Sequence, residues 1–444
     1  MIDTVNSNGR EWRSYNDFGN FITELGINNP PDVWSEMWDE AQKQYPGAQN
    51  MKFLTEEFIS EANQYLKLPE GAINAFNIAV NIVKNNEALS RLLWLNHYIL
   101  FSDEINGASN ILAGKKPVRF TFPDFSKPDA DFSRAEISFS GMFLALLLIS
   151  GLPRLLEFYK KHNIPEQVIL DTLSDIDIWM RDYYDKNNVW GLKEFWWIYN
   201  HFSGQLFRIG RLQFIHASFT GDLKAFRNKN TGKVIALSNA GIKYRADGQV
   251  DGTNDIYDPD GAWVSDYWED ENIVRGNPIS PLGYVEKKTI ELSKKEWKEV
   301  LSKGSFVLDV HIAAGSKLSH QACGESFKSA VEFFNNYFPE IEFCGFMCTS
   351  WLLDPQFQKI LSLDSNIVKF QREFYLYPVK SNDVQTFERV FNSKPENIKN
   401  LKAETTLQKA ILDYVNKGNK MHFGAMFLLN DDLKYWGSAF YQQN

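Results

Sequence analysis

Three reactive side chains, His311, His320 and Cys323, gather between a predicted strand and a predicted helix. The preceding run, 306–312, alternates apolar residues with period two, which predicts a strand. On that strand Asp309 and His311 share one face, about 7 Å apart along the backbone. A carboxylate at this spacing can orient an imidazole and raise its basicity, as a general base requires. A structural His–Asp contact at a sheet edge explains the pattern equally well.

The residues after this loop predict an amphipathic helix. Its buried stripe has the spacing i, i+3, i+4, i+7 and i+11, and consists of Phe327, Ala330, Val331, Phe334 and Phe338. We expect Gly324 or Ser326 to cap the first turn. Free backbone N–H groups at a helix start favour an anion, and Lys317 and Lys328 could assist. The turn therefore has the features of a phosphate or pyrophosphate site.

A second strand is predicted within 341–355, and it places Cys348 and Ser350 on one face. If this strand runs parallel to the first, a right-handed crossover puts both in the same sheet. Its polar end, with Cys348 and Ser350, would then lie beside His311 at the carboxyl edge. Open α/β sheets bind ligands at that edge. We take this convergence as the strongest functional signal in the chain.

Other chemistries could use the same side chains, but the sequence lacks the motifs that usually accompany them. Cys323 near a helix start could be a thiolate nucleophile, yet no cysteine-hydrolase signature surrounds it and a packed cysteine is commoner there. A zinc site through His311, His320 and Cys323 would lack the C-x-x-C and H-E-x-x-H spacings. Ser350 lies outside any G-x-S-x-G motif, and no Walker or Rossmann glycine pattern is present. We therefore expect no metal.

The bulk composition restricts the partners. A chain of 444 residues is long enough for two domains, and its net charge of −9 argues against nucleic acid. Only three cysteines are present and the first residues lack a signal-peptide pattern, so we expect a cytoplasmic protein. The longest apolar run, 142–152, is far shorter than the roughly 20 residues that cross a bilayer. We expect it to form a buried core helix, with no membrane association.

The periodicity changes along the chain. It is helical from 18 to 112 and again from about 139, and β-rich from Gly204, with a hairpin turning at 230–232. An acidic loop, 251–271, carries eight carboxylates but does not fit the EF-hand pattern. From Thr289 the pattern predicts helix and strand in alternation. We expect an α+β or α/β protein with a helical domain, 1–152, and a mixed-sheet domain, 153–444, whose helical entry extends to about 203.

Four segments resemble a bacterial N-acyltransferase family that joins a helical N-terminal domain to a domain similar to the GNAT acetyltransferase fold. The resemblance covers most of the chain, and the segments occur in the family's order: FRIGRLQF (207–214), LDVHIAAGSKLSHQACGESFKSAVEFF (308–334), FMCTSWLLDP (346–355) and SNIVKFQREF (365–374). It implies acetyl-CoA or another acyl-CoA as co-substrate. The pantetheine arm would enter between two splayed parallel strands.

The resemblance also implies roles for particular residues. Gln321 and Gly324 match the pyrophosphate motif of GNAT folds in general, Gln/Arg-x-x-Gly-x-Gly/Ala, whereas Ser326 replaces its last Gly or Ala. Backbone N–H groups near Ile312 and Ala313 would polarise the thioester carbonyl. The residues expected to bind the cofactor are Ile312, Ala313, Gly315, Ser316, Lys317, Gln321, Gly324 and Ser326.

The implied reaction is direct attack of a small-molecule amine on the acyl thioester. His311, oriented by Asp309, would take the proton of the amine. Ser350 or Cys348 would protonate the departing thiolate or line the cleft. The acidic loop would favour a cationic acceptor. The alternative is a non-catalytic ligand-binding or interaction protein that retains the acyltransferase fold.

Overall fold

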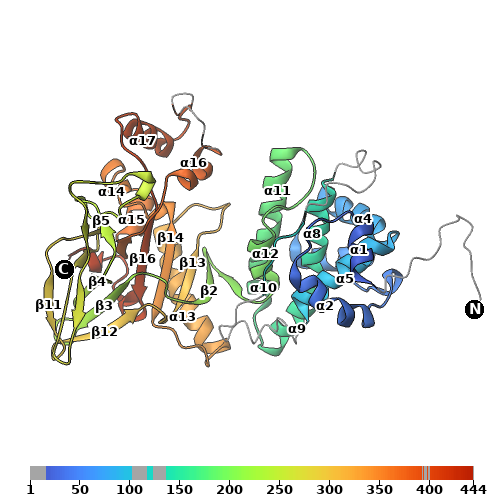
Figure 1. Ribbon diagram of the computed structural model, residues 1–444, viewed down its shortest axis with the longest axis horizontal. Coiled ribbons are helices and arrows are strands. Elements are labelled where there is room, and N and C mark those ends of the chain that lie inside the picture. The colour runs from blue at the N-terminus through green and yellow to red at the C-terminus, as the bar shows by residue number, and fades with distance from the viewer. Residues whose placement is uncertain are drawn as a thin grey trace, which may run out of the picture. The chain divides into compact units, whose positions relative to one another are not determined.

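The computed structural model describes residues 17–102, 118–123, 137–392, 394, 398 and 401–443. The chain divides into two compact units, Met1–Phe207 and Arg208–Asn444 (Figure 1). The helical stretch 153–203, which the sequence analysis assigned to the second domain, groups with the first unit by its contacts.

The first unit is mostly helical where it is described. The helices run in chain order as α1 (Phe18–Glu24), α2 (Asp32–Lys43), α3 (Glu56–Leu66), α4 (Glu70–Lys84), α5 (Glu87–Phe101), α8 (Phe139–Ser150), α9 (Leu152–Lys161), α10 (Glu166–Leu173), α11 (Asp175–Asn187) and α12 (Phe195–Phe202). This confirms the helical periodicity read from residue 18 onward. The end of that prediction, 103–112, lies outside the described residues.

Helix α8 is the core of the first unit. Ten of its twelve residues are buried, and it packs against α4, α5 and α12. With α9 it forms one stretch, Phe139–Lys161, that is long and apolar enough to cross a membrane by length and composition, but 72% of its most apolar window is buried inside the protein. The core helix of a globular protein passes the same test. The burial of α8 confirms the expected core helix at 142–152.

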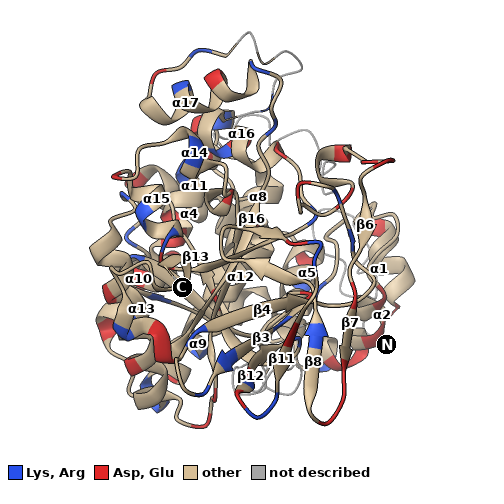
Figure 2. Ribbon diagram, turned by 90° about the vertical axis from the view of Figure 1, so that its left-hand side faces the viewer, with Lys and Arg blue, Asp and Glu red and all other residues tan. Residues whose placement is uncertain are grey.

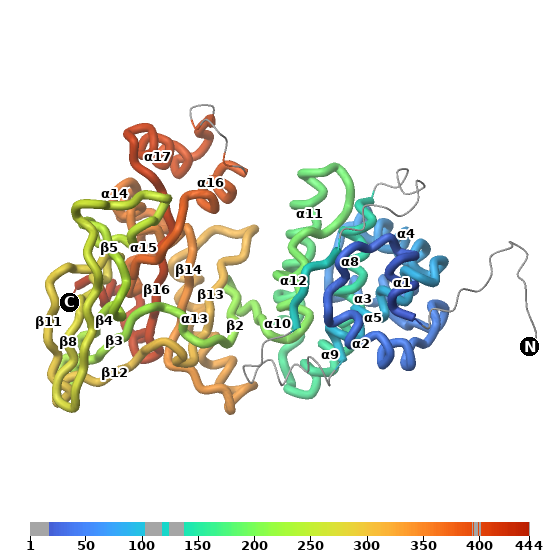
Figure 3. The backbone as a smooth tube through the Cα atoms, viewed as in Figure 1, coloured from blue at the N-terminus to red at the C-terminus, as the bar shows by residue number. Residues whose placement is uncertain are grey.

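The second unit contains a six-stranded sheet with the order β1-β2-β13-β14-β16-β15. Its strands are β1 (Leu206–Ile209), β2 (Leu212–Ser218), β13 (Phe306–His311), β14 (Gly345–Ser350), β15 (Tyr375–Pro378) and β16 (Gly424–Leu429). Between β13 and β14 the chain forms α13 (His320–Tyr337), a path that can be followed in Figure 3. Strands β13 and β14 are parallel neighbours, as the sequence predicted.

Smaller sheets complete the unit. A five-stranded sheet has the order β10-β9-β4-β3-β12. A three-stranded sheet has the order β11-β8-β7, and a two-stranded sheet pairs β5 with β6. The strands are β3 (Leu223–Asn228), β4 (Val234–Ser238), β5 (Lys243–Tyr244), β6 (Trp263–Val264), β7 (Tyr267–Glu269), β8 (Ile273–Gly276), β9 (Pro278–Ser280), β10 (Tyr284–Val285), β11 (Ile290–Ser293) and β12 (Trp297–Ser302). Figure 2 shows a basic position on β8 and an acidic one on β11, and these two residues, Arg275 and Glu291, are partners in the strand pairing.

Two predictions about this region have opposite outcomes. Strands β3 and β4 pair antiparallel around Gly232, which has a φ of +75°, so the predicted hairpin is confirmed. The helix expected from Thr289 is wrong, because β11 and β12 occupy that stretch. Strand β12 pairs with β3 along most of its length, and this tertiary pairing overrides the helical preference of its lysines and glutamates.

The remaining helices of the second unit are short, apart from α13. They are η3 (Thr253–Asp255), η4 (Trp351–Leu353), α14 (Phe357–Ile360), α15 (Asn366–Gln371), α16 (Val384–Phe391), α17 (Thr406–Val415), η6 (Asn430–Tyr435) and α18 (Phe440–Gln443). Helix α13 covers one face of the six-stranded sheet, where Phe327 contacts Phe214 and Phe346. The five-stranded sheet packs on the other face, since the Tyr375 hydroxyl donates to Ile279 O and accepts from Ala236 N.

Candidate active site

The pairing between β13 and β14 stops before their carboxyl ends. Strand β13 is paired with β2 over all six residues, and β14 with β16 over all six. Between β13 and β14 only Leu308 with Phe346 and Asp309 with Met347 are partners. At the amino ends Cys344 N donates to Phe306 O. The two parallel strands are therefore joined near their amino ends and not at their carboxyl ends.

The register separates the predicted catalytic side chains. Leu308 pairs with Phe346, so Cys348 and Ser350 share the face that α13 covers. Asp309 and His311 point to the opposite face. The prediction named only the sheet edge, and the register adds that the side chains at this edge lie two on each side of the sheet.

Asp309 and His311 are in contact. His311 Nε2 lies 3.3 Å from Asp309 Oδ2, and the two side chains are 33% and 29% exposed. The carboxylate can hold the imidazole in one orientation while solvent or a substrate reaches the pair. The geometry suits a general base, and the assignment remains a prediction.

Cys348 and Ser350 have other surroundings. Cys348 is buried, and this burial raises the pKa of its thiol well above the usual range, so the thiol is neutral at physiological pH. Ser350 caps η4 by accepting a hydrogen bond of 3.2 Å from Leu352 N. Either side chain can line the gap between the strands, and the Ser350 hydroxyl also caps η4.

Arg211 fixes the loop that follows β13. Its guanidinium donates to the carbonyl oxygens of Ala313, Ser316 and Lys317 at 2.8, 2.9 and 3.1 Å. Gly315, at the centre, has a φ of +91°, which other residues rarely adopt. Partial burial lowers the pKa of Arg211 somewhat, but an arginine stays charged. Because the Arg211 guanidinium binds three carbonyl groups of the loop, it holds the loop backbone in place.

Helix α13 begins earlier than predicted. Ser319 is its N-cap and accepts from Ala322 N at 3.4 Å, so the expected caps Gly324 and Ser326 lie within the helix. Ser319 has the short hydroxyl side chain that helix starts prefer, whereas the glycine suggested a loop. Of the amides that remain for an anion, those of His320 and Gln321 are nearest the helix start.

The residues of the expected pyrophosphate motif have packing partners. The exposed Gln321 amide donates to Glu325 Oε1 at 2.9 Å. A Cβ at Gly324 would lie 2.5 Å from Trp436 Nε1, so only glycine allows this close approach. Ser326 Oγ accepts from Arg211 N at 2.7 Å. This bond gives a physical reason for serine at the position where the general GNAT motif has Gly or Ala.

Three side chains near the helix start, Arg211, Glu373 and Trp436, were not predicted from the sequence. His320 Nε2 lies 2.9 Å from Glu373 Oε1, and the Glu373 Oε2 atom accepts from Gly437 N at 2.8 Å. The Trp436 indole stacks on His320 with ring centroids 5.1 Å apart. Arg211 and Glu373 lie within segments that carry the family resemblance, which was the available signal. Trp436 carried none.

The surroundings of Cys323 do not suit a nucleophile. Cys323 is fully buried on α13, and burial raises its pKa to about 11 in spite of the nearby Arg211 cation. The thiol is therefore protonated at neutral pH and is shielded from substrate. Within the described residues no group of three or more His, Cys, Asp or Glu side chains is arranged to hold a metal ion.

Several carboxylates of the acidic loop already have partners within the protein. Asp251 accepts from Asp258 N and pairs with Lys243, and the first of these bonds is the main cause of its lowered pKa. Glu269 pairs with Lys224 and Lys294, which lower its pKa to about 2. These carboxylates give little support to the expected attraction for a cationic acceptor.

The comparisons cover both units. The model of the N-acyltransferase N-terminal domain matches residues 57–204, and that of the GNAT-like C-terminal domain matches residues 206–427, half of the chain. No curated protein matches. Among solved structures, an acyltransferase with CoA and 10C-teicoplanin is 19% identical with a TM-score of 0.59, and one with decanoyl-CoA is 18% identical with a TM-score of 0.59. Each alignment covers 93% of this chain and 98% of the other.

The solved acyltransferases share the fold at this level of identity, and the two domain matches are in the order expected from the sequence. The chain belongs to the family that joins an N-acyltransferase N-terminal domain to a GNAT-like C-terminal domain.

Proposed function

We propose that the chain transfers an acyl group from acyl-CoA to an amine of a small-molecule acceptor. The observation that carries this proposal is the interrupted pairing of β13 and β14. A pantetheine arm has amide groups that can hydrogen-bond to exposed strand backbone as an added strand does. The arm would lie between the two strand ends, with its thioester close to Ile312 and Ala313.

The loop after β13 supplies the electrostatic part of the reaction. Arg211 holds the loop through the carbonyl groups of Ala313, Ser316 and Lys317. Backbone N–H groups held in this way can stabilise negative charge on the thioester oxygen without reorganising during the reaction. The start of α13 and the Arg211 cation favour the pyrophosphate at the same end of the sheet.

His311 would then act as the base. The amine nitrogen attacks the thioester carbon, the carbon–sulfur bond breaks, and the amine proton passes to His311. The CoA thiolate takes up a proton from solvent, because the buried Cys348 thiol, with its raised pKa, is too weak an acid to supply one. The solved acyltransferases of this fold hold octanoyl-CoA, decanoyl-CoA and teicoplanin. They support a medium-chain donor and a small-molecule acceptor for this chain.

The test combines binding and transfer. The full chain is incubated with acetyl-, octanoyl- or decanoyl-CoA and amine acceptors that include teicoplanin. Release of the CoA thiol and the acceptor mass are then measured. We expect one donor to yield an acceptor heavier by its acyl group. Binding of acyl-CoA without transfer to any amine would favour the non-catalytic alternative, and no binding of any donor would overturn the proposal.

A further inference from the structure

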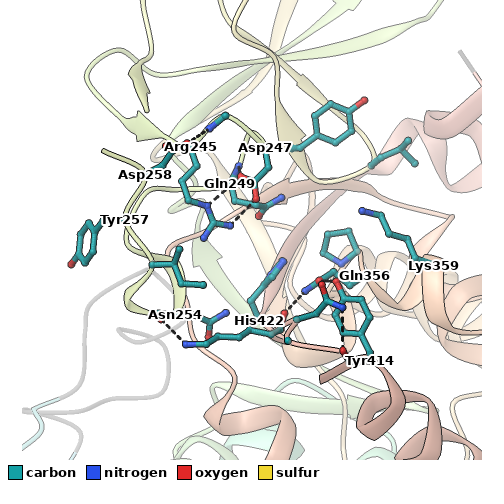
Figure 4. A pocket seen from close by; sticks show the side chains of 18 of the residues that line it. Arg245, Asp247, Gln249, Asn254, Tyr257, Asp258, Gln356, Lys359, Tyr414 and His422 are labelled. Carbon is teal, nitrogen blue, oxygen red and sulfur yellow. Dashed lines mark hydrogen bonds and ion pairs between the residues drawn. The ribbon is translucent and has the colours of Figure 1, made fainter. Parts of the chain in front are cut away.

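A cavity of about 810 Å³ lies within the second unit. We call it the loop cavity. One wall is the segment 245–259 together with Leu282 and Tyr284, and the other is formed by α14 and the segment 418–422 (Figure 4). Its volume is in the range of sites for small ligands, which span about 300–1,000 Å³.

One wall of the loop cavity lies at the sheet edge that carries the candidate active site. His422, which lines it, donates its backbone N–H to Asp354 Oδ2 at 2.8 Å. Asp354 follows β14 closely and His422 precedes β16, where Ser350 pairs with Gly424. Two strand spacings separate β16 from β13, so the start of β16, next to this wall, lies about 10 Å from the end of β13. A ligand of moderate size can span that distance.

The acidic groups of the loop cavity are already occupied. Asp247 accepts from Arg245 at 2.9 Å through its Oδ2 atom. Asp258 accepts from Ala246 N and Gly261 N, and these bonds are the main causes of its lowered pKa. Neither carboxylate needs a cationic ligand.

Within the part of the chain that the structure describes, two cations that line the cavity, Lys359 and Lys420, lack the anionic partner that Arg245 has in Asp247. Among the described residues no carboxylate pairs with Lys359 or Lys420, and the Lys420 ammonium has only a long contact, 3.4 Å, to Asn254 O. Gln358 Nε2 is buried in the wall without a hydrogen-bond partner. A buried donor without an acceptor costs free energy, which a ligand oxygen would recover. The wall therefore suits an anionic group.

The rim of the cavity is apolar and exposed. Four of its side chains, at 40%, 61%, 44% and 37% exposure, are Ile256, Tyr257, Leu282 and Tyr284. Exposed apolar groups collected around a concave site indicate a ligand with an apolar or aromatic body. The floor is fixed in advance, because Gln356 donates to Lys420 O and accepts from the Tyr414 hydroxyl.

We propose that the loop cavity is the acceptor site and that it takes an amine with an apolar body and a carboxylate. This rests on the proposed acyl transfer. The anion could instead be a phosphate of acyl-CoA. We choose the acceptor because of the side of the six-stranded sheet on which the cavity forms. Loops of the five-stranded sheet, which covers the face of Asp309 and His311, form part of the cavity. Helix α13, whose start favours an anion, covers the opposite face.

The test uses two dipeptide probes that differ only in charge, phenylalanylglycine and phenylalanylglycinamide. Their binding and that of octanoyl-CoA are measured by calorimetry on the full chain. We expect the acid to bind roughly tenfold more tightly than the amide, and Lys359→Ala and Lys420→Ala to remove this preference. The matched control is Lys409→Ala, an exposed lysine of α17 outside the cavity.

The outcomes separate the two proposals. Equal binding of acid and amide, no binding of either, or an equal effect of Lys409→Ala would overturn the acceptor site. Weaker octanoyl-CoA binding in the Lys359 and Lys420 variants would also overturn it, by assigning the cavity to a CoA phosphate. Failure of octanoyl-CoA to bind the unaltered chain would instead overturn the acyl-transfer proposal, whatever the dipeptides do.

Discussion

His311 and Asp309 form the only predicted catalytic pair that is both in contact and open to a substrate among the described residues. If His311 takes the proton of the amine, His311→Ala should lower kcat by about two orders of magnitude or more. Asp309→Asn should lower kcat less, because the imidazole stays and loses only its orienting carboxylate. Steady-state release of CoA measures both.

The control for this experiment is Asp364→Asn, which changes a 92% exposed carboxylate elsewhere in the unit. It should leave kcat unchanged. Unaltered turnover in His311→Ala, with the thermal unfolding temperature also unaltered, would show that the His–Asp pair is only structural.

Cys323 and Cys348 should be inert at neutral pH. Burial raises the Cys323 pKa to about 11, so the reactive thiolate is scarce below that pH. With iodoacetamide at pH 8, peptide mass spectrometry should find Cys344, which is partly exposed, alkylated well before the other two. Cys323→Ala should keep turnover within about twofold of the unaltered chain. Rapid alkylation of Cys323 would restore the nucleophile hypothesis.

The sequence predicts contacts within one strand and not across strands. Period two placed Asp309 beside His311, and the structure confirms that contact. The face of Cys348 depends on the register between β13 and β14, where a slip of one residue reverses every side chain. No local pattern contains that register, so the sequence could not predict that His311 and Cys348 lie on opposite faces of the sheet.

Among the elements, the loop after β13 depends on one side chain from another turn. Arg211→Ala removes three hydrogen bonds from a charged donor, so we expect the loop to loosen and the KM for acyl-CoA to rise about tenfold. Hydrogen–deuterium exchange of 312–318 should become faster. Arg181→Ala, which breaks an exposed ion pair, is the control and should change neither quantity.

Glu269 links β7 to neighbouring strands through Lys224 and Lys294. Its pKa falls from 4.5 to about 2, so its stabilising effect is present above pH 4.5 and disappears as the pH falls to about 2. Glu269→Gln should lower the unfolding temperature by about 2 °C at pH 6 and by nothing near pH 2. The control, Glu332→Gln, changes an exposed glutamate on α13. A pH-independent difference would contradict this account.

Element boundaries were predictable where local signals agree. The apolar period of α13 was correct, but its start was placed too late because Gly324 suggested a loop. The glycine is required by the Trp436 ring, which comes from a distant part of the sequence. Strand β12 was missed for a similar reason, since its partner β3 lies far away along the chain.

At the scale of the whole molecule, two units with separate cores carry two domain families in the expected order. The sequence showed the change from helical to β periodicity near residue 204, which is close to the division after Phe207. The domain boundary predicted at residue 152 was placed at the end of an apolar run. That run is the centre of the helical core rather than its end, because α9 to α12 continue the same unit.

The central claim is that the open carboxyl ends of β13 and β14 hold the pantetheine arm. Hydrogen–deuterium exchange with and without decanoyl-CoA tests it most directly. We predict that decanoyl-CoA slows exchange of the backbone amides at 310–314 and 348–350, and leaves β3 and β4 unchanged. Slower exchange confined to other segments, or no change at saturating decanoyl-CoA, would contradict the claim.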